Sequence, residues 1–242
     1  MRVIEDIHKS SRGTYGSPRV LAELKGLGFK CSKQRVERLM KKNGIRAKTR
    51  RKFRVTTDSK HKFPVAPNIL DRNFTPEASN AVWGGDITYV WTKEGWLFLA
   101  VIIDLFSRQV VGWSMDAKMT RELTLNALRM AINRRNPGAG LLHHTDRGSQ
   151  YASTDYQQML KAHKMICSMS RKGNCWDNAC IESFFHSLKT EMIYWEEFET
   201  REEACRKIFE WIEVFYNRKR RHSTLGYLSP VNFEIANVKQ CA

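Results

Sequence analysis

The sequence lacks the features that mark membrane, secreted and zinc-binding proteins. No apolar run approaches the roughly 20 residues that a membrane-spanning helix needs, and residues Met1 to His8 lack the apolar core of a signal peptide. Its six cysteines form no Cys-x-x-Cys pair and have no His-x-x-x-His partner, which argues against a zinc site and a disulfide framework. We therefore expect a cytosolic protein with reduced thiols, several of them in the core.

Acidic residues are also scarce. The chain has 25 Asp and Glu against 41 Lys and Arg, which gives a formal charge of +16 and a sequence pI of about 9.8. Such a balance favours a polyanionic partner, bound with release of counterions, and nucleic acid is the natural candidate. The 242 residues can bury the core of one or two domains, and the clustering of charge favours two.

Three of the few acids stand in specific contexts. They are Asp86 in Trp83-Gly-Gly-Asp-Ile-Thr-Tyr89, Asp146 in His144-Thr-Asp-Arg-Gly-Ser-Gln-Tyr151, and Glu182 in Asp177-Asn-Ala-Cys-Ile-Glu-Ser-Phe-Phe185. Apolar alternation over 81–89 predicts a strand that carries the first acid, and a short apolar run over 141–144 predicts a strand that ends at the second. Glu182 is expected on a helix, with Lys189 two turns further along the same face.

Clustered carboxylates suit a metal site for phosphoryl transfer. Mg²⁺ prefers oxygen ligands and is usually held by a few carboxylates together with substrate phosphate. In two-metal sites the ions stabilise the attacking and the leaving oxygen at phosphorus. Without cations, three such carboxylates would repel one another, and some would titrate at raised pH. We expect Lys189 to contact DNA rather than to catalyse.

The first 54 residues predict a DNA-binding unit. Pro18 can open a helix, Gly26 and Gly28 mark a break, and Ser32 can cap a second helix. The second helix would expose Lys33, Gln34, Arg35, Arg38, Lys41 and Lys42. Two helices around a glycine turn indicate a helix-turn-helix, and the pattern alone leaves a solvated helical hairpin equally open. Six cations within 45–54, including Arg50 and Arg51, favour a phosphate-tracking arm.

The remaining sequence predicts a linker and a mixed α/β domain. Residues 55–78 have little periodicity and three prolines, which is typical of a linker. From residue 79 the expected order is strands 81–91, 96–103 and 108–115, helix 121–134, strand 141–145, helix 153–163, strand 165–169, the Glu182 helix and helix 202–216. Three neighbouring strands followed by alternating helices and strands imply a mixed sheet with helices packed on it.

At these spacings, the chain resembles the D,D(35)E transposases of the insertion sequence 3 family and, through them, retroviral integrases. There are 59 residues between the first and second acids and 35 between the second and third. Further matching segments are Tyr15-Gly-Ser-Pro-Arg19, Arg38-Leu-Met-Lys41, Val101 to Trp113, Ser168 to Asn174, Lys189-Thr-Glu191 and Tyr216 to Pro230. The resemblance implies a ribonuclease H-like integrase core over 79–236, with a five-stranded mixed sheet, behind a small all-α helix-turn-helix domain over 1–54.

The resemblance also implies a reaction and partners. Asp86, Asp146 and Glu182 would hold Mg²⁺, with Mn²⁺ as a possible substitute, for DNA strand cleavage and strand transfer. The partners would be element ends and target DNA, a homo-oligomer on that DNA, and an upstream reading-frame product, fused or associated, because the chain shows no heptad segment. A bacterial cytoplasmic, nucleoid-associated location would follow. The expected DNA contacts are Lys189, Arg147, Arg171, Asn174, Asn178, Arg35, Arg38, Arg50, Arg51, Arg218 and Arg221.

Two other functions stay open on the sequence: a non-catalytic DNA-binding remnant or regulatory partner of a longer transposase, and a nuclease that cuts structured nucleic acid. The intact acids favour the transposase. Among neighbouring residues we expect Asp104 to shape a turn with Ser107, His143 to pack, and His144 to have a structural or substrate-positioning role. Asp177 or Asn178 is expected to cap the Glu182 helix, and Trp176 either stacks on a base or packs. The pair Gly84-Gly85 departs from the family pattern, since paired glycines weaken a strand; it softens the site or allows a close backbone approach.

Overall fold

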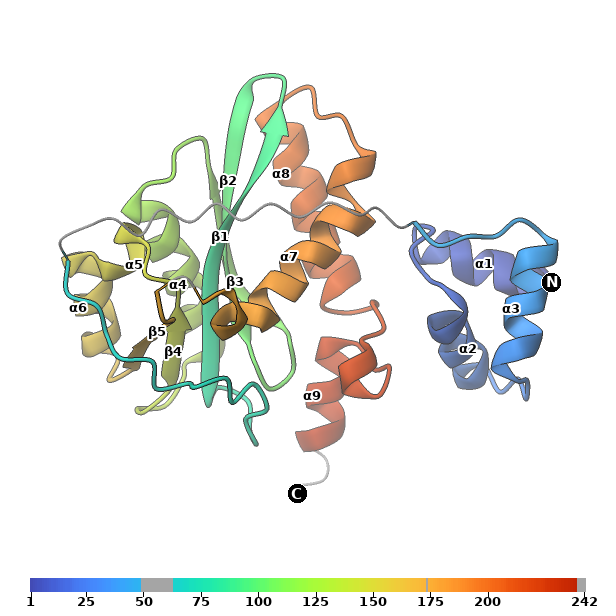
Figure 1. Cartoon of the computed structure of the whole chain (residues 1–242), viewed down its shortest axis with the longest axis horizontal. Helices are drawn as coiled ribbons and strands as arrows, with labels where there is room; N and C mark the ends of the chain where they lie inside the picture. Colours follow the sequence, from blue (N-terminus) through green and yellow to red (C-terminus); the bar gives the residue numbers. More distant parts are fainter. Residues whose placement is uncertain (49–62, 173, 239–242) are drawn as a thin grey trace.

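The computed structural model describes residues 1–48, 63–172 and 174–238. A group of three N-terminal helices lies beside a larger unit, in which helices cover both faces of a five-stranded sheet (Figure 1). The predicted arm residues Arg50 and Arg51 and the first part of the predicted linker lie outside the described residues. No helix in the described ranges is long and apolar enough to span a membrane.

The N-terminal group contains the predicted helix pair and one further helix. Helices α2 (Ser17–Gly26) and α3 (Lys33–Lys42) form the pair, with Pro in the first turn of α2 and the Ser32 hydroxyl accepting the Arg35 amide at 3.3 Å. Val20 and Val36 are buried between them. Helix α1 (Arg2–Ser10) was not predicted, because it buries only two residues of its own and has no side-chain cap.

The sheet confirms the predicted mixed topology. Strands β1 (Val82–Thr92), β2 (Gly95–Asp104) and β3 (Val110–Asp116) form an antiparallel meander, and β4 (Leu142–Thr145) and β5 (Ile166–Met169) add to it in parallel. The spatial order is β3-β2-β1-β4-β5. The strand that carries Asp86 is therefore central, with the strand that leads into Asp146 beside it.

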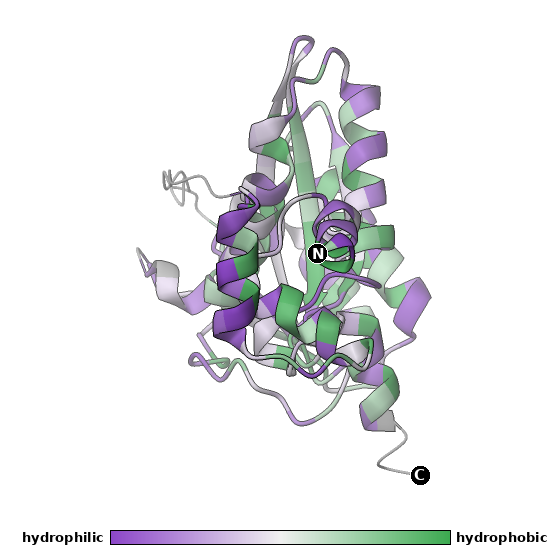
Figure 2. Ribbon diagram, turned by 90° about the vertical axis from the view of Figure 1, so that its right-hand side faces the viewer, coloured by the Kyte–Doolittle hydropathy of each residue, from purple (hydrophilic) through white to green (hydrophobic). Residues whose placement is uncertain are grey.

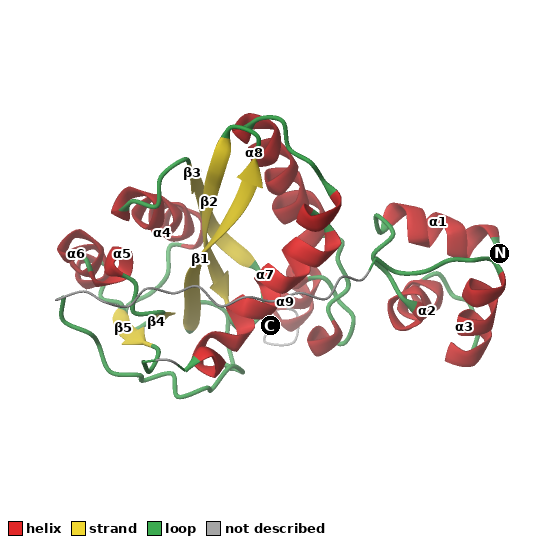
Figure 3. Ribbon diagram, turned by 45° about the horizontal axis from the view of Figure 1, so that its top comes forward, coloured by secondary structure: helices red, strands yellow, loops and turns green. Residues whose placement is uncertain are grey.

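Two helical layers bury the faces of this sheet (Figure 3). Helices α4 (Arg121–Arg135), α5 (Ser149–Ala152) and α6 (Thr154–Ala162) lie on one side, and α7 (Ala179–Glu191) and α8 (Arg201–Glu210) lie on the other. Alternate residues of β2 supply the two cores: Val101 packs in the α7 cluster and Ile102 in the α4 cluster. Figure 2 shows hydrophilic and hydrophobic residues alternating along the helices that face the viewer.

The C-terminal part departs from the predicted single helix over 202–216. Helix α8 ends at Glu210 and the chain continues as a π-helix, Trp211–Tyr216, followed later by α9 (Pro230–Val238), which was not predicted. Short 3-10 turns occupy Cys175–Asn178, Ile193–Trp195 and Ser223–Leu225. The π-helix begins at Trp211, whose large ring is buried. The spacing of apolar residues predicts a helix but does not show how such a ring packs.

The described part of the predicted linker, residues 63–78, is a strap packed on the sheet. Leu70 is buried, and the Ser168 hydroxyl on β5 accepts the backbone amides of Ile69 and Leu70 at 2.9 and 3.2 Å. Irregular backbone held by single hydrogen bonds leaves no periodic signal, so the sequence could not distinguish this strap from a free linker.

The N-terminal group docks on the C-terminal half of the chain through ion pairs. Arg221 makes a two-pronged pair with Glu23 of α2, at 2.7 and 2.8 Å. Arg19 of α2 reaches Glu191 at the end of α7 (3.1 Å), and the buried Arg220 binds the same carboxylate. Apolar residues of α1 to α3 belong to the same buried cluster as α7 and α8. The helix that carries Glu182 is thus joined to the helix-turn-helix.

Candidate active site

Parallel strand pairing brings the first two acids together. The last paired residues of β1 and β4 are Gly85 and Thr145, so Asp86 and Asp146 follow at the next matching position. Adjacent strands lie about 4.8 Å apart, and matched residues project from the same face. Each carboxylate also accepts a nearby amide, Asp86 from Ile87 at 2.7 Å and Asp146 from Gly148 at 2.8 Å. Both acids are therefore held in fixed orientations on the same face of the sheet.

The third acid approaches on helix α7, which covers this same face. Asp86 is paired with Val101, whose side chain belongs to the α7 cluster. Ile181, directly before Glu182, is buried against β1: a Cβ built on Gly84 would lie 2.7 Å from its Cδ1 atom. Gly84 therefore allows the helix to lie close to the strand two residues before Asp86. This contact supports the close-approach alternative for Gly84.

The charges of the other two acids affect the titration of Asp86. Burial raises the pKa of Asp86 well above its usual value, and the charges of Asp146 and Glu182 raise it further. Burial also raises the pKa of Glu182. Lys189 is close as well, since burial lowers its pKa while the charges of Tyr89 and Asp86 oppose that shift. The site thus concentrates negative charge, with one lysine beside it.

The donor set fits a hard divalent cation, because carboxylate oxygens are the ligands that such ions prefer. The raised pKa of Asp86 shows that the carboxylates repel one another, and a cation between them would relieve this repulsion. Within the described residues, no three His, Cys, Asp or Glu side chains already form a ready-made metal cluster. Ion binding would therefore require side-chain adjustment, for which half-buried Glu182 at the start of α7 has room.

The two neighbouring histidines are neutral parts of the interior. Burial lowers the pKa of His143 to about 3 and that of His144 to about 4. His143 Nε2 lies 2.7 Å from the Tyr156 hydroxyl, and His144 Nδ1 lies 2.8 Å from the Ser168 hydroxyl that also holds the strap. The packing role expected for His143 and the structural role expected for His144 agree with these contacts.

Asp177 is not the side-chain cap that the sequence predicts for α7. The residue at the cap position is Asn178, and it makes no side-chain cap bond. Fully buried Asp177 instead accepts hydrogen bonds from Arg171, Arg72 and Asn68. The Arg171 side chain holds the pKa of this carboxyl well below its usual value. Asp177 therefore ties the strap to the loop before α7.

Asp104 lies at the end of β2 and shapes the turn there, as predicted. Its carboxylate accepts the amides of Phe106 (3.0 Å) and Asn80 (2.8 Å) and pairs with Arg135 at 3.2 Å. Ser107 accepts the Gln109 amide in the same turn. This acid is enclosed by structural partners on the side of the strand end, away from the pair formed by Asp86 and Asp146 at the β1–β4 edge.

The predicted DNA contacts fall into two groups. Arg35 and Arg38 on α3 are exposed, as are the other four polar residues predicted to face outward there, and Arg218 is exposed too. The second group is engaged within the protein. Arg147 donates to the Ser170 carbonyl, Arg171 donates to Asp177, and Arg221 donates to Glu23. The side-chain oxygens of Asn174 and Asn178 are buried, and Lys189 is half-buried. Trp176 is 69% exposed, which excludes the packing alternative within the described chain.

Two features near the acids were missed from the sequence. The buried Tyr151 hydroxyl lies close to both aspartates, since burial and then neighbouring Tyr156, Asp86 and Asp146 raise its pKa. The sequence signal that could have indicated Tyr151 was its position in the segment that carries Asp146. The second feature is the group Tyr89, Trp91 and Trp96 on the β1–β2 hairpin, whose rings contact one another. Alternating aromatic residues in the strand pattern could have indicated it.

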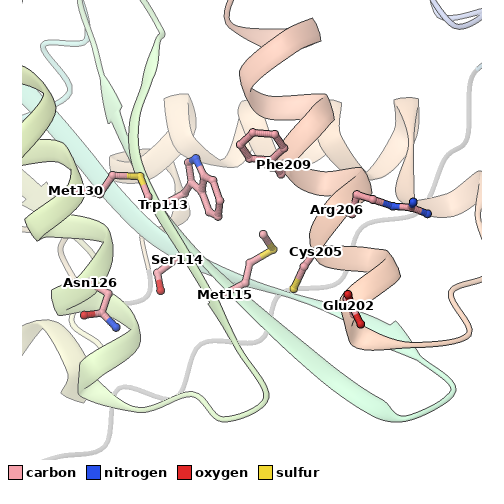
Figure 4. Close-up of a pocket in the computed structure, with 9 residues that line it drawn as sticks. All are labelled: Trp113, Ser114, Met115, Asn126, Met130, Glu202, Cys205, Arg206 and Phe209. Atoms are coloured by element: carbon pink, nitrogen blue, oxygen red, sulfur yellow. The ribbon is translucent and has the colours of Figure 1, made fainter.

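A separate open groove of about 520 Å³ lies on edge strand β3, between α4 and α8 (Figure 4). It is lined by Trp113, Ser114, Met115, Asn126, Met130, Glu202, Cys205, Arg206 and Phe209. None of the three acids lines this groove, and its walls are mainly apolar. It is therefore no part of the carboxylate site.

Sequence comparisons identify relatives along nearly the whole chain. The profile described as HTH-like domain matches residues 1–53, and two profiles described as integrase core domain match residues 76–175 and 182–238. The chain is 49% identical over 230 residues to a 31 kDa protein of insertion element IS600 from Shigella sonnei, covering 95% of this chain and 85% of that protein. It is also 49% identical over 228 residues to transposase InsF for insertion sequence IS3A from Escherichia coli, with 94% and 79% coverage.

Solved structures show the same fold at low sequence identity. The simian T-cell lymphotropic virus intasome in complex with PP2A regulatory subunit B56 gamma matches with a TM-score of 0.56 and 15% identity, covering 96% of this chain and 74% of that chain. The HTLV-2 integrase catalytic core domain in complex with magnesium, in its trimeric form, matches with a TM-score of 0.51 and 19% identity, covering 65% and 98%. These likenesses confirm the integrase-type fold.

Proposed function

The chain belongs to the insertion sequence 3 family of transposases with an integrase core, and we propose that Asp86, Asp146 and Glu182 are the acids with which it cleaves and joins DNA. The observations that carry this assignment are the strand register that puts Asp86 beside Asp146 and the charges of Asp146 and Glu182, which add to burial in raising the pKa of Asp86. Carboxylates kept this close repel one another, and a bound cation would relieve that repulsion. The family relation supplies the reaction, DNA strand cleavage and strand transfer.

A divalent metal fits this site, and we assign Mg²⁺ as the ion, with Mn²⁺ able to replace it. When bound, such ions stabilise the attacking and leaving oxygens at phosphorus and help to deprotonate the nucleophile. Asp86 and Asp146 would hold them from the sheet, and Glu182 from the helix. Lys189, two turns after Glu182, would hold the neighbouring phosphate. The solved viral integrase core with magnesium supports a divalent ion at this fold.

The DNA would reach this site along basic surface on both units of the chain. Exposed Arg35 and Arg38 on α3 and exposed Arg218 after the π-helix are suited to phosphate contacts. Because strand transfer joins two DNA ends, we infer that a homo-oligomer acts on the paired ends and the target. An upstream reading-frame product, fused or associated, and a nucleoid-associated place in the bacterial cytoplasm complete this proposal.

The domain division that we propose is 1–54 for DNA binding, 55–78 for the connection and 79–236 for catalysis. The matched profiles begin and end near these limits. The packing of residues 63–78 on the sheet makes the second half of the connection a part of the catalytic unit.

Strand transfer by the purified chain tests the assignment. Labelled element-end DNA with Mg²⁺ is compared for the wild type, Asp146→Asn, and Glu122→Gln as a control at an exposed acid of α4. We expect joined products with the wild type and the control and none with Asp146→Asn, although all three bind DNA. Equal joining by Asp146→Asn would remove this acid from the mechanism. Binding without joining by all three proteins would favour the non-catalytic alternative or an obligatory upstream partner.

A further inference from the structure

Three aromatic side chains form a ladder on the β1–β2 hairpin. Tyr89 and Trp91 leave β1 on the same face, and Trp96 lies directly opposite Trp91 on β2. The ring centroids of Trp96 lie 5.0 Å from Tyr89 and 4.8 Å from Trp91, with near-perpendicular planes. Trp91 is 59% exposed and Trp96 45% exposed. Large rings that contact one another in solvent, rather than in the core, indicate a binding surface.

This aromatic ladder is continuous with the carboxylate site. The Lys189 ammonium lies 5.0 Å from the centre of the Tyr89 ring, and Asp86 is near enough to affect the same lysine. Along β1, Tyr89 follows Asp86 by three residues and Trp91 by five, so the three rings leave the sheet on the face opposite to Asp86. Within the described residues, β4 pairs with β1 only as far as Gly85. Lys189, which lies near both Asp86 and Tyr89, therefore connects the two faces along the part of β1 that β4 does not pair.

The charges around the hairpin tip favour a particular occupant. Lys93 pairs with Glu199 at 2.6 Å, and Arg201 donates to the carbonyl groups of Trp96 and Glu94. Those cations are already engaged, so the tip is unsuited to gripping a row of phosphates. Lys189 at the other end is the group to which we assign the neighbouring phosphate. Single-stranded DNA matches this layout, because one of its phosphates can lie at the site while its base faces stay uncovered. A duplex hides its base faces.

We propose that Tyr89, Trp91 and Trp96 form a stacking subsite for unpaired bases of the DNA strand that enters the active site. Stacking on aromatic side chains is tolerant of sequence, because every base has a π-face. The direction of the strand rests on the proposed function of the three acids, but stacking itself does not need them.

Binding of a labelled twelve-residue oligo(dT), compared with a duplex of equal length, tests the subsite by fluorescence anisotropy without added metal. The variant Trp91→Ala/Trp96→Ala is compared with Phe209→Ala, which removes an exposed ring of α8 away from the hairpin. We expect the double variant to lose about tenfold or more in oligo(dT) affinity and less than twofold in duplex affinity. The Phe209 control should match the wild type for both DNAs.

A further variant separates stacking from folding. Trp91→Tyr/Trp96→Tyr keeps two π-faces and should recover most of the lost affinity. Unchanged oligo(dT) binding by the alanine variant would overturn the proposal, and so would an equal loss for the duplex. A fall in molar mass by light scattering with unchanged oligo(dT) affinity would assign the aromatic ladder to a second copy of the chain instead. Oligo(dT) binding is measured without metal and strand transfer with it, so failure of the catalytic assignment is measured separately.

Discussion

Asp86 and Asp146 lie at matching positions one step beyond the last paired residues of two parallel strands. Their separation is fixed by the backbone spacing of a sheet, about 4.8 Å, and not by side-chain contacts that a rotamer change could undo. The protein therefore keeps two carboxylates together whether or not a cation separates them. The closeness of these two carboxylates determines how the stability of the protein responds to pH and to divalent ions.

Asp86→Asn should stabilise the metal-free protein at neutral pH. The folded-state pKa of Asp86 is raised, so the protonated form is favoured by folding. That contribution is complete below the usual pKa of about 4 and is lost as the pH rises through the folded value. The neutral amide avoids the loss, which is on the order of 1 kcal/mol or more. Thermal unfolding with a chelator at pH 5 and pH 8 should show the variant gaining on the wild type at pH 8; no gain there would contradict the raised pKa.

Divalent ions should raise the Tm of the wild type. An ion that binds only the folded state stabilises it by about 2.7 kcal/mol at one hundred times its Kd. Titration with Mg²⁺ and Mn²⁺ should shift the Tm of the wild type and of Glu122→Gln, and should have little effect on Asp86→Asn or Asp146→Asn. Equal shifts in all four proteins would show that the ions bind elsewhere.

Gly84→Ala should impair strand transfer by moving α7. Its methyl group would lie 2.7 Å from Ile181 Cδ1, and such overpacking costs about 1–3 kcal/mol. A displacement near 1 Å at the adjacent Glu182 can reduce the rate about a hundredfold. Ile181→Val removes Cδ1 and leaves Cγ1 at 3.0 Å, so the double variant should recover part of the activity. Gly138→Ala, where a methyl group meets nothing within 4 Å, is the control. A double variant no better than Gly84→Ala would contradict the packing argument.

Asp177→Asn should destabilise the protein by about 1–2 kcal/mol, because it removes the charge that Arg171 and Arg72 bind, while both arginine side chains keep access to solvent. The pKa of Asp177 is lowered by Arg171, so its contribution is present above about pH 4 and is lost as the pH falls below that. Urea unfolding at pH 7 measures the loss. The difference between wild type and variant should shrink in acid; a constant difference would indicate a role independent of charge.

Exchanging Glu23 and Arg221 separates domain docking from DNA contact. Glu23→Arg and Arg221→Glu each break the pair between α2 and the C-terminal segment, and the double exchange should restore about 1 kcal/mol of coupling. Thermal unfolding completes the double-mutant cycle. If Arg221 also contacts DNA, the double exchange will regain stability without regaining affinity for duplex. Full recovery of both would leave docking as its role.

The sequence predicted the parts of the molecule that depend on local pattern. The strands around Asp86 and Asp146 are marked by apolar alternation, and the Ser32 cap by a hydroxyl at the right position. Helix α1, the strap and the role of Asp177 depend on contacts between distant segments. Asp177, for example, is bonded to Asn68 and Arg72, more than one hundred residues away, and no local pattern encodes that partnership.

The site was predictable in its acids but not in its arrangement. The spacing of Asp86, Asp146 and Glu182 is a family signature, so the residues could be named. The register that matches Gly85 with Thr145 is a tertiary result, as is the contact of Ile181 with Gly84. The glycine pair looked like a weakness of the strand, because an absent side chain shows its purpose only when the neighbour that fills its space is known.

The parallel pairing of β1 and β4 has a consequence for synthesis of the protein. The meander β1 to β3 is local and can form soon after it leaves the ribosome, whereas β4 joins only after the following helix, α4, has been made, and α7 follows later. A nascent chain interrupted before Asp146 would fold a sheet with a single acid. With the three proposed acids, DNA cleavage has to wait until α7 has been translated and has packed on the sheet.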